Sequence, residues 1–116
     1  MTVTLYGLNR CSTCLKARAW LDAHGVRHEF VDYRDHPVAP ARLKEWAAQV
    51  GGWGKLVNRA SMTWRNLPDT LKSPAGDEQW LALIADYPAL VRRPVTVVDG
   101  QASVGFSEKR YAQQFA

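Results

Sequence analysis

The beginning of the chain contains the pattern that most restricts its fold. Residues 3–7 (VTLYG) are β-prone and end at a glycine, and residues 12–24 carry apolar side chains at helical spacing before Gly25, a suitable C-terminal cap. Residues 26–32 then alternate apolar and polar side chains, which indicates a second strand. Because a strand, a helix and a strand in succession form a right-handed crossover, we predict a βαβ unit with two parallel strands.

The rest of the chain predicts further helices and a hairpin. In chain order we predict a helix over residues 41–50, short helices within residues 55–71 and a helix over residues 77–87. A β-hairpin over residues 95–104 and a last helix over residues 107–115 follow. This order predicts an α/β protein with a four-stranded mixed sheet, helices over the sheet and a helical insertion between its second and third strands. A thioredoxin-like fold fits this topology.

Length and composition permit one domain over residues 1–116. Hydrophobic residues are 47% and charged residues 22%, which excludes a disordered or fibrous chain. No apolar run reaches the roughly 20 residues of a membrane helix and no basic leader begins the chain, so we expect a cytoplasmic protein without a membrane partner. The net charge is +4, but the basic residues are scattered, and we expect no direct contact with nucleic acid.

Two cysteines, Cys11 and Cys14, lie where the first predicted strand meets the first helix. A cysteine at a helix N-terminus has a lowered pKa, because the helix places unpaired amides and partial positive charge there. Arg10 and Lys16 add positive potential. We therefore predict that Cys11 is the nucleophile and that Cys14, one turn later, can attack a mixed disulfide formed at Cys11.

Two other interpretations of the cysteines remain open. Both thiols could be small buried side chains, which is the usual environment of free cysteine. A zinc site would need two more ligands, and none of the three histidines (His24, His28 and His36) forms a paired ligand spacing with a cysteine or another histidine. We expect no bound metal.

Residues 5–21 (LYGLNRCSTCLKARAWL) resemble the first motif of the arsenate-reductase-like (ArsC) family, and the Spx/YffB branch of that family is the most similar. Five later motifs match this branch in the same order: residues 32–34 (DYR), 55–59 (KLVNR), 63–65 (TWR), 92–94 (RRP) and 104–106 (VGF). The resemblance thus spans almost the whole chain. It implies a thioredoxin-like fold with a helical insertion and a nucleophilic first cysteine, here Cys11.

The resemblance also implies an anion site beside this cysteine. In the family an arginine before a proline helps to bind the anionic substrate or product, and these positions are Arg93 and Pro94, joined by a cis peptide bond. The YffB-like members are glutathione-dependent thiol reductases, which implies glutathione as a co-substrate and no bound cofactor. The carboxylates of glutathione would suit Arg93, Arg59 or Lys16, although each of these charges could instead be ordinary solvated surface.

The chain departs from the family's glutaredoxin-coupled arsenate reductases, which place three arginines around the cysteine. Asn58 stands where one arginine is expected, and residues 104–106 offer none near the third position. We therefore expect weak or absent arsenate reduction, and we favour a monomeric, glutathione-dependent thiol-disulfide reductase that acts on glutathione or a protein disulfide. The rival function is that of the Spx proteins, which use this fold and its cysteine pair as a redox switch while binding RNA polymerase.

Overall fold

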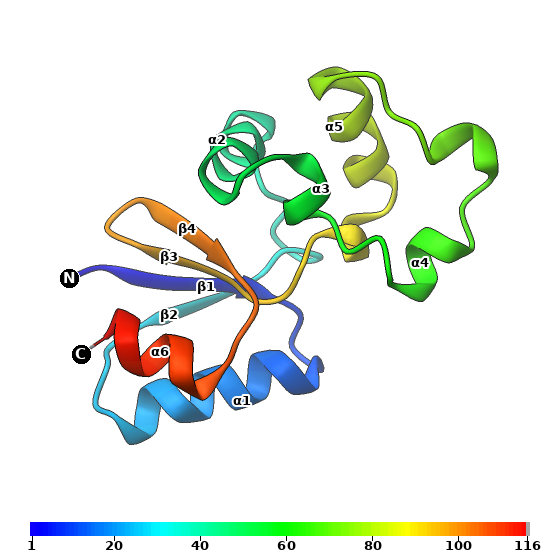
Figure 1. Ribbon diagram of the computed structural model, residues 1–116. Coiled ribbons are helices and arrows are strands. Elements are labelled where there is room, and N and C mark those ends of the chain that lie inside the picture. The colour runs from blue at the N-terminus through cyan, green and yellow to red at the C-terminus, as the bar shows by residue number, and fades with distance from the viewer. Residues whose placement is uncertain (116) are drawn as a thin grey trace.

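The computed structural model describes residues 1–115 and contains a central sheet with helices around it (Figure 1). The elements are β1 (Val3–Gly7), α1 (Ser12–Ala23), β2 (Glu29–Asp32), α2 (Pro40–Val50), α3 (Trp53–Leu56), α4 (Met62–Arg65), η1 (Asp69–Leu71), α5 (Asp77–Asp86), η2 (Pro88–Leu90), β3 (Val95–Val98), β4 (Gln101–Val104) and α6 (Glu108–Gln114). The strand order is β2-β1-β3-β4, with β1 parallel to β2 and the other two pairs antiparallel. The predicted mixed sheet and thioredoxin-like fold are confirmed.

Helices cover both faces of this sheet (Figure 1). On one face, Leu5 of β1 packs with Leu21 of α1 and Tyr111 of α6 in a buried apolar cluster. On the other face, Tyr6 meets Trp46 of α2 edge-on, with ring centroids 4.7 Å apart. Successive side chains of a strand point to opposite faces, so β1 serves both cores at once. This double burial holds the loop after β1 in a defined place.

A short backbone bridge joins the end of α3 in the helical insertion to the segment that leads into β3. Val57, at the end of α3, pairs with Val91 in antiparallel fashion, and both side chains are buried. The Arg92 N–H donates to the Leu56 carbonyl and the Asn58 N–H to the Leu90 carbonyl, each at 2.8 Å. The segment that enters β3 is therefore fastened to the insertion immediately before Arg93.

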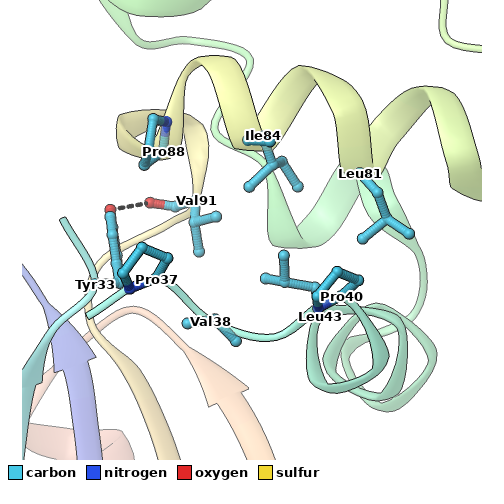
Figure 2. Close-up of a pocket in the computed structure, with 10 residues that line it drawn as sticks. Tyr33, Pro37, Val38, Pro40, Leu43, Leu81, Ile84, Pro88 and Val91 are labelled. Atoms are coloured by element: carbon cyan, nitrogen blue, oxygen red, sulfur yellow. Dashed lines mark hydrogen bonds between the residues drawn. The ribbon is translucent and has the colours of Figure 1, made fainter. Parts of the chain in front are cut away.

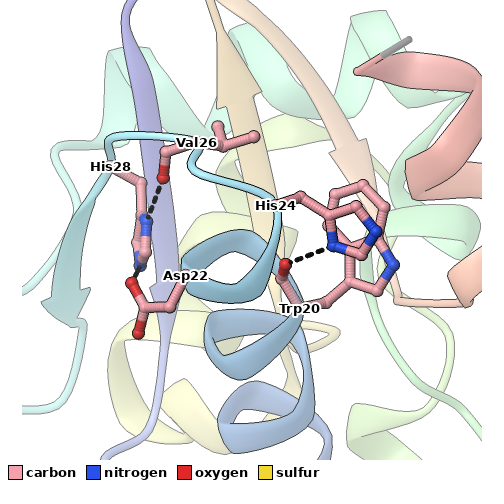
Figure 3. Close-up of polar contacts among 5 residues, drawn as sticks. All are labelled: Trp20, Asp22, His24, Val26 and His28. Atoms are coloured by element: carbon pink, nitrogen blue, oxygen red, sulfur yellow. Dashed lines mark hydrogen bonds and ion pairs between the residues drawn. The ribbon is translucent and has the colours of Figure 1, made fainter.

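The second strand is shorter than predicted, because β2 begins at Glu29 and not at Val26. Gly25 has φ of +68° and ends α1 as predicted, and the Val26 N–H donates to the Leu21 carbonyl at 2.9 Å as part of that cap. The ring of His28 then lies between two acceptors (Figure 3): Nδ1 is 2.9 Å from the Val26 carbonyl and Nε2 is 4.0 Å from Asp22. The first residues after α1 thus complete the helix cap before the sheet begins.

The helical insertion contains the short helices predicted over residues 55–71, with different bounds. The predicted region 55–71 divides into α3, α4 and η1, and α3 begins before it, at Trp53. The described part of the chain has no helix that combines the length and the apolar character needed to cross a membrane.

Candidate active site

Cys11 is the residue that caps the N-terminus of α1. Its backbone is extended, with φ −73° and ψ 122°, and its N–H donates to the Leu8 carbonyl at 3.1 Å. Its carbonyl accepts the first helical bond, from the Leu15 N–H at 3.0 Å. The side chain is partly exposed. The turn after β1 therefore presents the Cys11 sulfur at the positive end of a helix of 12 residues.

Cys14 lies one helical turn further on and is fully buried. Its sulfur packs directly against Gly7 at the end of β1, so closely that a Cβ on Gly7 would overlap Cys14 Sγ. Only a residue without a side chain permits this contact between α1 and β1. The two cysteines therefore have different environments although they are neighbours on the same helix.

The environments move the two thiol pKa values in opposite directions. Burial alone would raise the pKa of Cys11, but the helix-terminal N–H groups of Cys14 and Thr13, the Cys14 thiol and the charge of Arg93 together lower it below the ordinary value. Burial raises the pKa of Cys14 to about 11, and the neighbouring Cys11 adds to that shift. Near neutral pH the thiolate is therefore concentrated on the exposed sulfur.

Cys11 opens into a charged cleft of about 610 Å³. Its wall includes five charged side chains, three of them basic: Arg10, Arg34, Arg93, Asp32 and Asp35. Arginine guanidinium groups suit carboxylates and other planar or tetrahedral oxyanions. The cleft thus places cations and acceptors together beside a reactive sulfur.

Arg93 is the predicted anion-binding residue that the structure brings to Cys11. It is half-buried, its Nη1 donates to the Ala89 carbonyl at 3.3 Å, and its charge is the smallest of the causes that together lower the pKa of Cys11. The Arg93-Pro94 peptide bond is cis, as the resemblance implied, and Pro94 is buried. Pro94 therefore lies behind the cleft wall, and Arg93 faces the cleft.

The structure does not bring Lys16 and Arg59 to the same place. Lys16 lines a separate depression between α1 and the start of α6, together with Trp20 and Phe106. Arg59 lies with its guanidinium against Gly54 of α3. Neither is among the described residues that line the cleft. A partner bound at Cys11 would reach them only by extending beyond this cleft.

Asp32, at the end of β2, was not singled out as a site residue. Its two carboxylate oxygens accept from the Asn9 N–H at 2.9 Å and the Arg34 N–H at 2.8 Å. The Asn9 N–H is the main reason that the pKa of Asp32 lies below its ordinary value. Since parallel neighbours end at the same sheet edge, an acidic residue closing the second strand was the available signal. Asp32 holds the turn that presents Cys11.

We expect alkylation to distinguish the two thiols. Iodoacetamide near neutral pH should modify Cys11 first, because its lowered pKa leaves more thiolate and its sulfur is accessible. Peptide mass mapping over a pH series should place the midpoint for Cys11 below 9.0, the ordinary thiol value. Equal labelling of both thiols, or faster labelling of Cys14, would contradict the assignment.

Comparison with known proteins shows the family of this chain. The ArsC family pattern matches residues 6–114. An uncharacterized protein of Haemophilus influenzae is 39% identical over 114 residues, covering 98% of this chain and 99% of that one. The Global transcriptional regulator Spx of Listeria innocua is 32% identical over 108 residues, covering 91% and 81%. The solved YFFB protein superposes with a TM-score of 0.90 at 36% identity, covering 99% and 100%. The chain that carries Cys11, Cys14 and the cis proline on this fold belongs to the ArsC family.

Proposed function

We propose that this protein is a glutathione-dependent thiol-disulfide reductase with Cys11 as its nucleophile. The observation that carries the proposal is the pairing of an accessible thiol of lowered pKa with a buried thiol of raised pKa one turn away. Arg93 in the same cleft provides a cation for a carboxylate of glutathione. A reducing compartment such as the cytoplasm would supply the reduced glutathione.

In the proposed reaction, the Cys11 thiolate attacks the glutathionyl sulfur of a disulfide between glutathione and a polypeptide. A bond forms between Cys11 Sγ and glutathione, the original S–S bond breaks, and the polypeptide leaves as a thiolate that takes a proton from water. A second glutathione thiolate then attacks the glutathionyl sulfur, which releases glutathione disulfide and restores the Cys11 thiolate. Cys14 offers a second route: its thiolate attacks Cys11 Sγ, displaces glutathione and leaves a Cys11–Cys14 disulfide for two glutathiones to reduce.

Titration of the reduced protein with glutathione disulfide tests this function directly. Intact mass spectrometry should show one glutathione added per chain, followed by loss of that mass as the internal disulfide forms. Turnover with glutathione, measured through glutathione reductase and NADPH, should then accompany the mixed disulfide. A protein whose mass does not change under these conditions would contradict the proposal.

Arg93→Ala should slow the reaction with glutathione disulfide about tenfold or more, since a hydrogen bond to a charged group contributes roughly 1.5–3 kcal/mol. The matched substrate is a small neutral disulfide, which has no carboxylate for Arg93 to bind. Loss of the Arg93 charge also raises the pKa of Cys11. The rates with glutathione disulfide and with the neutral disulfide are therefore measured across pH and compared where the Cys11 thiol is fully ionised. Equal slowing of both substrates there would contradict a binding role for Arg93.

Arsenate reduction should be weak or absent in this protein. Asn58 is engaged locally, its Oδ1 accepting from the Ala60 N–H at 3.0 Å, and Phe106 packs edge-on against Tyr111 at 4.7 Å. Neither position provides a guanidinium for a tetrahedral oxyanion. Assays with arsenate, glutathione and glutaredoxin should show turnover near background, and robust turnover would show that another cation replaces the missing contacts.

A second candidate function is redox-sensitive regulation through RNA polymerase. The observation in its favour is the similarity to the Spx regulator of Listeria innocua, together with the Spx-like motifs. Specific co-purification with RNA polymerase, sensitive to the oxidation state of Cys11 and Cys14 and without turnover in the glutathione-coupled assay, would favour this function over the reductase.

A further inference from the structure

An apolar pocket lies on the other side of the segment that follows β2 (Figure 2). Its volume is about 290 Å³, and the helices α2 and α5 form two of its walls. Leu81 and Ile84 of α5 point into it from one side, facing the prolines of the segment after β2 (Figure 2). Its described lining carries no charged side chain. The cleft around Cys11, in contrast, is lined by several charged side chains.

The pocket is preformed, and its described lining is mostly apolar. Three of its lining residues, Pro37, Pro40 and Pro88, have a fixed φ, so the wall loses little entropy when it is filled. The one side-chain hydroxyl in the lining, that of Tyr33, already donates to the Val91 carbonyl at 2.9 Å. An occupant therefore has to be an apolar group. The volume is near the lower limit for ligand sites, which suits one aliphatic or aromatic side chain.

The pocket and the Cys11 cleft share one short segment of chain. Asp32, Arg34 and Asp35 line the cleft, whereas Tyr33 and Pro37 of the same segment line the pocket. The charges of Cys11 and Arg93 both act on the pKa of Tyr33, which burial raises to about 12. Tyr33 is therefore the partition between the two sites. A molecule bound at Cys11 would have to cross this segment to reach the pocket.

We propose that the pocket receives an apolar side chain of a polypeptide whose glutathionylated cysteine is the substrate of Cys11. The inference rests on the proposed reductase function and names its substrate class. Glutathione consists of γ-glutamate, cysteine and glycine, and has no apolar side chain that could fill the pocket. The charged cleft then binds the glutathionyl group of a polypeptide–glutathione disulfide, and the pocket selects the polypeptide.

A second copy of the chain is a less suitable occupant. A stable dimer buries about 800 Å² of each protomer, whereas this pocket accommodates roughly one side chain. A polypeptide held in the cleft by its glutathionyl group needs no such area, because binding of that group already raises the effective concentration of the neighbouring side chain at the pocket.

Glutathionylated synthetic peptides test the proposal. Each peptide carries one cysteine and either leucine or serine placed two, three or four residues from it on either side, and kcat/KM is measured for each pair. In the wild-type protein, leucine in at least one position should raise kcat/KM about tenfold over serine, as expected for burying one apolar side chain. Glutathione disulfide is measured alongside as a substrate without a side chain for the pocket.

Two matched variants locate the preference. Ala85 is exposed on α5 and lines the pocket, so Ala85→Phe should fill it and reduce the leucine-to-serine ratio to about one. Ala82 is exposed on the same helix but lines a different surface, so Ala82→Phe should keep the tenfold ratio. Because the preference is a ratio within one variant, changes in Cys11 reactivity cancel.

The outcomes separate this inference from the function on which it rests. If the wild-type protein reduces neither glutathione disulfide nor any peptide, the reductase function fails and the pocket proposal fails with it. If it reduces them without a leucine preference, or if Ala85→Phe keeps the preference, only the pocket proposal is overturned. A wild-type dimer in sedimentation that Ala85→Phe dissociates would assign the pocket to a second copy and also overturn it.

Discussion

Cys11→Ser should abolish the reaction with glutathione disulfide. The thiolate is the attacking species, and a serine hydroxyl at the same helix terminus does not ionise near neutral pH, so the backbone N–H groups and Arg93 have no anion to stabilise. The variant should fold normally, because Cys11 is partly exposed and serine is a preferred N-cap residue. Intact mass spectrometry after exposure to glutathione disulfide should show no added glutathione.

Cys14→Ser is the matched control for this loss. The variant keeps Cys11 and the Cys14 backbone N–H that helps to lower the pKa of Cys11, so the first attack should remain. Without a second sulfur the mixed disulfide cannot convert to an internal disulfide, and one glutathione per chain should accumulate. If Cys14→Ser were inactive and Cys11→Ser active, the proposed roles would be reversed.

Gly7→Ala should destabilise the fold by about 1–3 kcal/mol, the usual range for overpacking a close contact in a core. The added Cβ would overlap Cys14 Sγ and also lie 3.5 Å from the ring of Phe30. Gly7 is in β1, so alanine suits the backbone and the expected effect comes from the collision. Urea unfolding should show the loss of free energy, with Tm lower by about 4 °C for each kcal/mol.

A double-mutant cycle separates this contact from a general effect of alanine. In Gly7→Ala/Cys14→Ala the new Cβ would meet the Cβ of residue 14 at 3.6 Å and the Phe30 ring at 3.5 Å, both ordinary contacts, so much of the lost stability should return. Gly76→Ala is the control: a Cβ added there would have no atom within 4 Å, so only the less favourable N-cap of α5 should remain, at a loss of about 0.5–1 kcal/mol. Additive effects of Gly7→Ala and Cys14→Ala would show that the sulfur is not the obstacle.

Much of the fold follows from local patterns in the sequence. The βαβ opening, the cap at Gly25 and the final hairpin each depend on residues adjacent along the chain, and all three are present. The predicted start of β2 at Val26 was wrong, because Val26 is still hydrogen-bonded in the cap of α1. The alternation of apolar and polar residues contains no information about that hydrogen bond. Short helices in the insertion were also poorly bounded, since tertiary packing decides where such elements begin and end.

The sequence by itself also determined the chemistry that this protein can offer: two cysteines one helical turn apart at a helix N-terminus. Spacing alone places Cys11 at the cap and Cys14 inside the first turn, because helical geometry repeats over short distances. The motif resemblance added Arg93 and Pro94, which lie far from the cysteines in the chain. Together these four residues define the core of the candidate site.

Only the tertiary structure decided which of the candidate residues meet. Cys14 packs with its sulfur against Gly7 on a different element, and its burial sets its pKa apart from that of Cys11. Arg93 reaches the cleft while Lys16 and Arg59 do not, and the apolar pocket beside it forms between helices distant in sequence. Which charged side chains come together, and where a cavity forms, depends on how separate segments pack, and local periodicity does not encode that packing. A helix cap, in contrast, depends only on residues adjacent to it in the chain.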